Sequence, residues 1–276
     1  MAIPAKVAAR VAAGIKRFQP VLSAAKSRDV NESDTVVIVM DMLQEVFGYD
    51  KYSDITSEHA IKGTYCDLAI KFEGALQMLL EVKAIGLELK DSHVKQAVDY
   101  AANQGTEWVV LTNGIRWRIY KVIFAKPIDN ELVVELNLLE LNPKNEDHLD
   151  LVWLLAKEGW QKKGLGEYQM HREALSRFFL GAVLLSDPVL EVVRRELRRL
   201  TPGAKIEVDE IEAVLRQDVI KREVIEGEKA DEARKQLGRA ASRALKAKSK
   251  ATDDPPVAPP SIVMQKPATT GDKPDA

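Results

Sequence analysis

Residues 63–140 carry the sequence pattern that most restricts the fold of this chain. Runs of β-branched, aliphatic and aromatic residues follow one another there, separated by turn signals, as is typical of β-strands. One helical pattern, over residues 92–103, lies among them, with Asp91 or Ser92 as its cap and Gly105 beyond its end. Strands interrupted by a helix predict an α/β fold with a mixed sheet. The expected strands are residues 64–70, 75–84, 108–111, 116–124 and 131–141.

Helical patterns lie on both sides of this stretch. Residues 1–30 are poor in acids and rich in Ala, Val and Ile, which is compatible with a transit peptide or with a docked helix. We favour the docked helix, because its pattern continues into the next segment. A second helix is expected over residues 35–47, with Asn31 or Ser33 as its cap and Gly48 at its end. Further helices are expected over residues 172–185, 188–200, 209–217 and 219–247.

The chain therefore divides into four predicted regions. An N-terminal helix occupies residues 1–30, an α/β domain residues 31–145 and a helical extension residues 146–250. The remaining residues, 251–276, contain six of the chain's twelve prolines and few large apolar residues, which predicts a disordered tail. We do not expect this tail to carry chemistry.

Composition excludes several classes of protein. One cysteine and four histidines among 276 residues cannot build a disulfide framework or a zinc cluster. No apolar run approaches the roughly 20 residues of a membrane span, so we expect a cytoplasmic protein without membrane contact. The net charge of −2 argues against a uniformly basic nucleic-acid binder. Any contact with nucleic acid must then be local.

Two basic segments could supply such a local contact. Residues 221–250 contain ten Lys or Arg and five Asp or Glu, and residues 194–199 contain four arginines near a predicted helix end. A solvated helix is the alternative for the first segment, because its apolar residues form no continuous stripe. For the second segment, the alternative is that the helix dipole alone favours arginines near the end of the helix.

Two of the expected strands predict an antiparallel hairpin, because Glu73-Gly74 is a turn signal between them. One register gathers the apolar residues on a single buried face, and it sets Asp67 opposite Glu81 on the other face. A two-residue loop would shift this register by one residue, so we expect a three-residue loop or a bulge. The apolar pairs are Cys66 with Val82, Leu68 with Leu80 and Ile70 with Met78.

Asp67 and Glu81 would repel each other across this hairpin unless a cation lies between them. Oxygen ligands suit Mg²⁺ or Mn²⁺. Lys83 points to the same side, where an ammonium could orient a water or offset charge on a phosphate. The spacing therefore indicates metal-assisted phosphodiester hydrolysis. A solvated salt bridge is the alternative for so short a motif, but the strongly apolar strand around Glu81 favours a site.

The helix after the hairpin adds a second pair of residues. Gln96 and Tyr100 are four residues apart and are expected to lie together off the apolar stripe of this helix. They could contact a phosphate or a base, or support Lys83, and an ordinary, partly exposed tyrosine is the alternative. Cys66 is expected to be a small buried side chain, not a reactive thiol.

Four motifs follow one another in the α/β domain: Cys66-Asp67-Leu68, Leu80-Glu81-Val82-Lys83, Gln96 with Tyr100, and Leu111-Thr112-Asn113-Gly114 with Trp117. Together they resemble the PD-(D/E)XK nuclease superfamily, and most of all the N-terminal nuclease domain of type I restriction enzyme R subunits. The resemblance covers residues 31–141. It implies a restriction-endonuclease-like fold, in which helices flank a mixed sheet. Cys66 stands where the family name has proline.

This resemblance implies a role for each candidate residue. Gln96 and Tyr100 would match a Q-x-x-x-Y pair. Family members often carry an acid on the helix before the hairpin, and Glu32 fits that position better than Glu45, although either could be a capping or surface residue. The catalytic and metal-binding positions would be Asp67, Glu81 and Lys83, with the Val82 carbonyl as a further metal ligand.

The implied activity is Mg²⁺- or Mn²⁺-dependent hydrolysis of DNA, in restriction or other defence against foreign DNA. Implied partners are DNA and restriction-modification subunits, and a homo-oligomer is open because a double-strand cut ordinarily requires two active sites. No G-x-x-x-x-G-K-[ST] phosphate loop occurs, so we expect no ATP and no translocating motor. Two alternatives stay open: a non-cleaving nucleic-acid- or partner-binding module with the nuclease fold, and a structural subunit with a salt-bridge cluster.

Overall fold

The computed structural model describes residues 3–61, 64–72 and 74–252. The predicted disordered tail therefore lies outside the described residues, except for its first two positions, which continue a helix.

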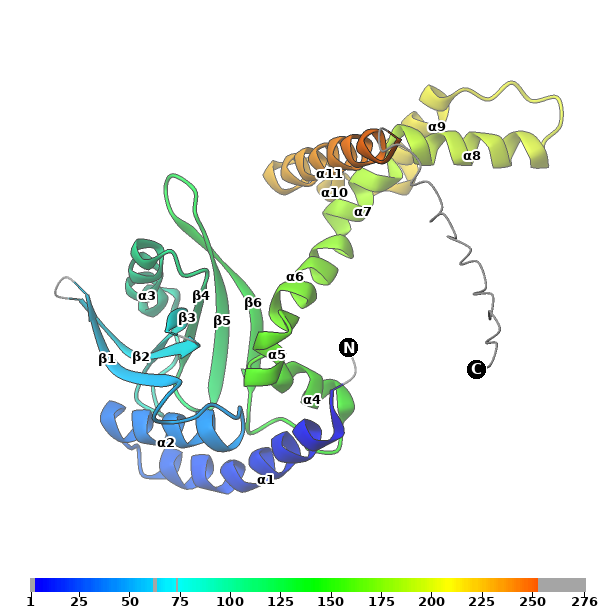
Figure 1. The fold of residues 1–276 in the computed structure, drawn as a ribbon. Helices are drawn as coiled ribbons and strands as arrows, with labels where there is room; N and C mark the ends of the chain where they lie inside the picture. The colour runs from blue at the N-terminus through cyan, green and yellow to red at the C-terminus, as the bar shows by residue number, and fades with distance from the viewer. Residues whose placement is uncertain (1–2, 62–63, 73, 253–276) are drawn as a thin grey trace, which may run out of the picture. The chain divides into compact units, whose positions relative to one another are not determined.

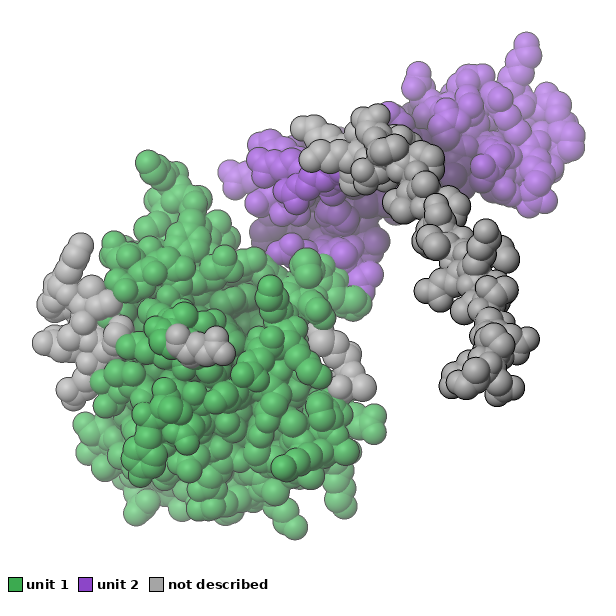
Figure 2. All heavy atoms as spheres, in the orientation of Figure 1, with its two compact units in different colours: residues 1–172 green, residues 173–276 purple. Residues whose placement is uncertain are grey.

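The chain forms two compact units, residues 1–172 and 173–276 (Figure 2). This boundary differs from the one that the sequence suggested, after residue 145. The first helix beyond residue 145, α4 (Glu146–Trp153), belongs to the first unit, because Val152 and Trp153 are buried in the same core as the N-terminal helix. Composition alone did not reveal the boundary between the two units, since the helical pattern of the sequence does not change there.

A mixed sheet of six strands forms the centre of the first unit, and its strands lie in chain order (Figure 1). Strands β3 and β4 are parallel and are joined by helix α3 (Asp91–Gln104), whereas the other neighbouring strands are antiparallel. The predicted α/β class is confirmed. The strands are β1 (Ile55–Ile61), β2 (Thr64–Phe72), β3 (Ala75–Val82), β4 (Trp108–Thr112), β5 (Arg116–Ile123) and β6 (Asp129–Asn137).

Five of these strands were predicted, with their ends displaced by a few residues. Strand β6 ends earlier than expected because the Asn137 side chain accepts a hydrogen bond from the Leu139 amide at 3.2 Å and turns the chain. Strand β1 was not predicted. It is an edge strand. Polar residues such as Ser57 and Glu58 interrupt its apolar pattern, so the segment resembles a turn in sequence.

The helices of the first unit follow their capping signals closely. Helix α1 spans Ala5–Ser27. Helix α2 (Glu32–Glu45) begins at the predicted cap Asn31, whose side chain accepts a hydrogen bond from the Asp34 amide at 2.9 Å. Helix α3 starts one residue earlier than predicted, because Lys90 is its cap. It ends at Gly105, whose φ of 69° is readily adopted by glycine.

The C-terminal helices are more broken than their patterns suggested. Ser176 interrupts the helix expected over residues 172–185, since its hydroxyl accepts a hydrogen bond from the Phe179 amide at 3.2 Å and caps a new helix. Gly227, with a φ of 91°, interrupts the one expected over residues 219–247. The helices are α5 (Lys157–Gln161), α6 (Gly164–Ala174), α7 (Arg177–Leu184), α8 (Asp187–Leu200), α9 (Val208–Val214), the π-helical turn Leu215–Val219, α10 (Arg222–Ile225) and α11 (Glu228–Thr252).

No helix within the described ranges combines the length and the apolar composition that crossing a membrane requires.

The sheet is covered on both faces (Figure 1). Helices α1 and α2 pack on one face, where Leu68, Leu80 and Val82 contribute to the first core. Helix α3 packs on the other face over a smaller, second core that includes Leu79 and Leu111. Alternate residues of β3 therefore point to different cores, as the period of a strand requires. The next two positions on the α3 side after Leu79 are Glu81 and Lys83.

The hairpin of β2 and β3 has the predicted register. Leu68 pairs with Leu80 and Ile70 with Met78, and the register then shifts by one residue toward the turn. This shift leaves Gln77 as the extra residue of a β-bulge. Of the two expected devices, a three-residue loop or a bulge, the structure has the bulge, and without it the apolar side chains would not share a face.

Gly159 offers a test of packing in the first unit. A Cβ atom at this position would lie 2.0 Å from the main-chain carbonyl oxygen of Trp153, so Gly159→Ala is expected to lower the free energy of unfolding by about 1–3 kcal/mol. Gly166→Ala is the matched control, because nothing lies within 4 Å of its Cβ position, and it should stabilise α6 by about 0.5–1 kcal/mol. Urea denaturation measures both, and equal effects would contradict this packing.

Candidate functional site

The candidate site forms where β2 and β3 separate. The residue pairs between these two strands end at Leu68 and Leu80. Beyond this pair, side chains of β2 form hydrogen bonds with main-chain groups of β3. The Asp67 carboxylate accepts a hydrogen bond from the Val82 amide at 2.7 Å, and the Cys66 thiol donates to the Leu80 carbonyl at 3.0 Å. The sequence predicted a regular cross-strand pair of Asp67 and Glu81. In the structure they do not form such a pair, but they remain neighbours.

Cys66 corrects one detail of the predicted hairpin. It was expected on the same buried face as Leu68 and Ile70, yet it packs in the second core under α3. The reason is that the regular pairing with β3 has already ended, so the register no longer fixes its direction. Its expected burial is confirmed, with 1% of the residue exposed. Burial, with the charges of Glu81 and Asp67, raises the pKa of the Cys66 thiol to about 12, which leaves it unreactive at neutral pH.

Lys83 joins three segments of the chain at this point. Its ammonium lies 2.7 Å from Glu81 Oε1 and 3.5 Å from Glu32 Oε2, and its own amide donates to the Thr112 carbonyl at 2.8 Å. Only 17% of the Lys83 side chain and 9% of the Glu81 side chain are exposed. The structure therefore brings both predicted carboxylates, the predicted lysine and Glu32 of α2 together.

The charges of this cluster perturb one another. Partial burial raises the pKa of Asp67 above its ordinary value, and the hydrogen bond from Val82 and the charge of Lys83 only partly oppose it. Burial also raises the pKa of Glu81, which is further raised by Asp67 and Glu32. Burial alone would lower the pKa of Lys83, but its contact with Glu81 and the other acids outweighs this and raises it. The site is thus a partly desolvated acidic cluster balanced by one ammonium.

Main-chain geometry sets the direction of the Val82 carbonyl. The Lys83 amide points toward β4, where it meets Thr112. A trans peptide places its carbonyl on the side opposite its amide, so the Val82 carbonyl faces the β2 side, where Asp67 lies. Within the described ranges, no three His, Cys, Asp or Glu side chains form a group that could hold a metal ion.

Glu45, Tyr100 and Gln96 take other positions in the fold. Glu45, the second candidate for the additional acid, forms an ion pair with Arg17 instead. Tyr100 is 5% exposed and lies in the second core, so the expectation that it stands off the apolar stripe was wrong. It lies about 60° around the helix from Ala97, and the second core is wide enough to cover that position. Gln96 is exposed on α3.

The arginines at residues 194–199 each lie within 4 Å of a glutamate. Arg194 contacts Glu191 at 2.6 Å, and Arg198 contacts Glu207 at 3.1 Å. Arg195 and Arg199 share Glu196, at 3.8 and 2.8 Å. These partners weaken the case for a positive surface on α8, which the sequence had left open.

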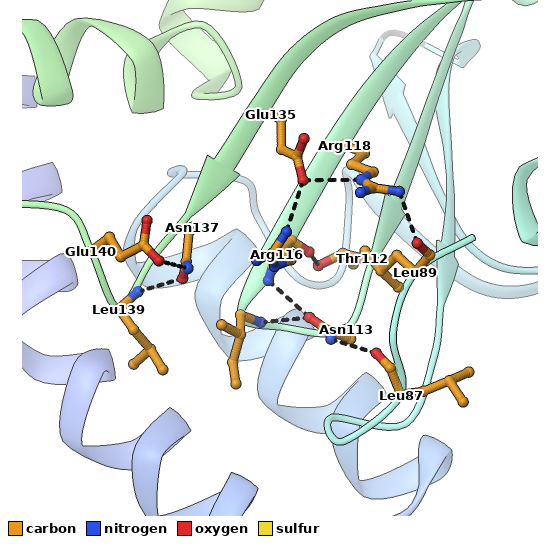
Figure 3. A network of polar contacts seen from close by, with 11 residues as sticks. Leu87, Leu89, Thr112, Asn113, Arg116, Arg118, Glu135, Asn137, Leu139 and Glu140 are labelled. Carbon is orange, nitrogen blue, oxygen red and sulfur yellow. Dashed lines mark hydrogen bonds and ion pairs between the residues drawn. The ribbon is translucent and has the colours of Figure 1, made fainter. Parts of the chain in front are cut away.

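The turn between β4 and β5 contains polar residues to which the sequence assigned no role (Figure 3). Asn113 is 6% exposed, and its side-chain amide donates to the carbonyls of Ile85 and Leu87, at 3.3 and 2.9 Å. Arg118 donates to the Leu89 carbonyl at 2.8 Å. These carbonyls belong to the loop that follows Lys83. The motif at residues 111–114 contributed to the family resemblance, but no local signal indicated which distant segment Asn113 would hold.

Residues 37–134 match the family model of the type I restriction enzyme R protein N terminus. Comparisons with curated proteins and with solved structures found no match. The matched segment begins in α2 and ends in β6, so it contains the β2–β3 hairpin, α3 and the β4–β5 turn. This segment thus forms a domain similar to the N terminus of type I restriction enzyme R proteins, with the restriction-endonuclease-like α/β fold that the four motifs predicted.

Proposed function

We propose that this chain is a divalent-metal-dependent DNA nuclease, in which Asp67, Glu81 and Lys83 perform phosphodiester hydrolysis. The observation that carries the proposal is the convergence of two partly desolvated carboxylates and one ammonium where β2 and β3 separate. Carboxylates that are held together despite mutual repulsion are suited to a cation.

The residues present fit Mg²⁺ or Mn²⁺. These ions are bound through one or two carboxylates and keep several waters. Asp67 and Glu81 would supply the carboxylates, and the Val82 carbonyl a third oxygen. Glu32 reaches the cluster through Lys83, so it would act nearby and not as a necessary ligand. When bound, the ion would activate a water and neutralise charge on the scissile phosphate.

Lys83 has the protonation state and the position for electrostatic work. Its raised pKa keeps it an ammonium at neutral pH, so it would donate hydrogen bonds to the attacked phosphate and offset the charge that develops there. Glu81 holds the ammonium at 2.7 Å and fixes its direction. The ion pair of Lys83 and Glu81 would therefore orient both the substrate phosphate and the Glu81 carboxylate.

DNA as the substrate, and a role in restriction, rest on the match to the restriction enzyme family. The same match is compatible with a chain that binds nucleic acid or a partner subunit without cutting. Metal-dependent cleavage separates these functions, because a binding module would retain DNA affinity without metal and would produce no nicks.

The test is cleavage of supercoiled plasmid DNA by the full chain in Mg²⁺ or Mn²⁺, with EDTA as the metal-free arm. We expect cleavage only with metal, and Lys83→Ala should lower its rate about 100- to 1000-fold, as the loss of a preorganised charged donor does. Lys71→Ala is the matched control, because Lys71 lies in the same hairpin near the turn and away from the cluster.

Two results would count against the proposal. Cleavage at an equal rate by wild type and Lys83→Ala would assign the activity to another site or to a contaminant. Metal-independent DNA binding without any cleavage would favour the non-cutting module.

A further inference from the structure

We propose that Asn113 is a positioning residue for Lys83, and that it acts by clamping the loop at residues 84–90. The inference rests on the proposed function, because it concerns the same site. It assigns a purpose to a buried asparagine that neither touches the acidic cluster nor belongs to the core.

The loop at residues 84–90 connects Lys83 to α3 and has little secondary structure of its own. Three of its carbonyl oxygens point to the β4–β5 hairpin. Asn113 Nδ2 donates to the carbonyls of Ile85 and Leu87. Figure 3 shows the contact with Leu87 and the one from Arg118 Nη1 to the Leu89 carbonyl. Buried carbonyl groups need such partners, and Asn113 serves the buried Ile85 carbonyl and also the carbonyl of the more exposed Leu87.

The Asn113 side chain is itself held at both ends. Its Oδ1 accepts hydrogen bonds from the amides of Ile115 and Arg116, at 3.1 and 2.8 Å. Thr112 closes the same turn, since its hydroxyl donates to the Arg116 carbonyl at 2.8 Å. The amide that reaches the loop is therefore preorganised by the turn (Figure 3).

The loop is also confined on its other side. A Cβ atom on Gly86 would lie 2.3 Å from the Asp29 carboxylate, so the main chain at Gly86 closely approaches the segment between α1 and α2. That segment leads directly into Glu32, which contacts Lys83 at 3.5 Å. With Asn113 on one side and Asp29 on the other, the loop has little freedom to move.

This geometry couples Asn113 to Lys83 over a short path. The Lys83 amide is bonded to the Thr112 carbonyl, next to Asn113 in the chain. Asn113 in turn holds Ile85, two residues after Lys83. Release of the loop would leave the Lys83 main chain fixed on one side only, and a displacement of about 1 Å at a reacting group can cost about 100-fold in rate.

Asn113→Asp is the sharpest variant. It keeps the oxygen that accepts from the turn amides but replaces the donor to Ile85 and Leu87 by a second acceptor. Asn137→Asp is the matched control: Asn137 also accepts a turn amide through Oδ1, but its Nδ2 donates to Glu140 at the end of β6 (Figure 3). Arg118→Leu tests the other end of the clamp should Asn113→Asp fail to fold.

The first measurement is metal-dependent plasmid cleavage by the full-length variants. We expect kcat to fall about 10- to 100-fold in Asn113→Asp, with KM within about twofold of wild type. Asn137→Asp should retain both constants. A general loss of folding would lower the active fraction and the melting temperature instead, so the melting temperature is recorded alongside.

The second measurement does not need activity. The Lys83 ammonium, held by Glu81 and Glu32, should give a nitrogen-15 resonance that is missing in Lys83→Arg, and this signal should be lost in Asn113→Asp and kept in Asn137→Asp. An unchanged signal in folded Asn113→Asp, or in Arg118→Leu if the former does not fold, would overturn the inference. If wild type does not cleave, the nuclease proposal fails, whereas the resonance still decides whether Asn113 positions Lys83.

Discussion

Asp67→Asn is expected to lower the rate of metal-dependent DNA cleavage about 1000-fold or more. The variant keeps the side-chain oxygen that accepts the Val82 amide at 2.7 Å, so the separation of β2 and β3 should persist. It removes the negative charge that would bind the divalent ion, and metal catalysis supplies several kcal/mol of stabilisation, each 1.36 kcal/mol being about tenfold in rate. Plasmid nicking in Mn²⁺ measures the loss.

The same variant should stabilise the metal-free protein. The pKa of Asp67 is raised in the folded chain, with burial as the main cause, so at neutral pH its ionised form is less favourable in the folded than in the unfolded state. The amide removes this cost. We therefore expect a higher melting temperature for metal-free Asp67→Asn than for metal-free wild type.

Added metal should make wild type more stable than Asp67→Asn, the reverse of the order expected without metal. Mn²⁺ at about 100 times its dissociation constant would stabilise a protein that binds it by about 2.7 kcal/mol, and Asp67→Asn should lose that response. Asp99→Asn, on the exposed side of α3, is the control and should behave as wild type. A melting temperature that rises equally with Mn²⁺ in wild type and in Asp67→Asn would exclude Asp67 as a ligand.

Trp117→Ala is expected to lower the free energy of unfolding by about 3–5 kcal/mol, as large truncations in cores do. Trp117 is 1% exposed and lies in the first core, with its ring 4.9 Å from that of Phe47. Its indole nitrogen also donates to the Gly114 carbonyl at 2.9 Å, which ties the β4–β5 turn to the core. The variant would leave both a cavity and a buried carbonyl without its partner.

Urea denaturation followed by circular dichroism measures this change. Tyr52→Ala is the control, because Tyr52 is 93% exposed and its truncation should change stability by less than about 0.5 kcal/mol. A loss below about 1 kcal/mol in Trp117→Ala would mean that the site is not packed as described.

The hairpin shows how far local pattern can reach. Because side chains alternate along a strand, the apolar residues of β2 and β3 favoured one register, and this register required a three-residue loop or a bulge. The structure has the bulge, at Gln77. The same alternation placed Glu81 and Lys83 on one side of β3. Strand β1 escaped prediction, because an edge strand needs no continuous apolar face.

The burial of Tyr100 and the direction of the Cys66 side chain could not be predicted from the local sequence pattern. The width of the buried arc on α3 depends on how the sheet twists beneath it, so the apolar stripe alone left Tyr100 outside. The direction of Cys66 depends on where β2 leaves β3, which is set by a side chain, Asp67, competing for the Val82 amide.

The sequence by itself determined the α/β class, through the order of its strand and helix patterns, and the hairpin register, through alternation along two neighbouring strands. The same alternation selected Asp67, Glu81 and Lys83 as the candidate set. Only the tertiary structure decided that Glu32 and not Glu45 reaches Lys83. It also decided that Asn113 holds the loop beyond Lys83. These contacts join residues far apart in the chain, and their geometry is fixed by the packing of α2 and the β4–β5 turn around the sheet.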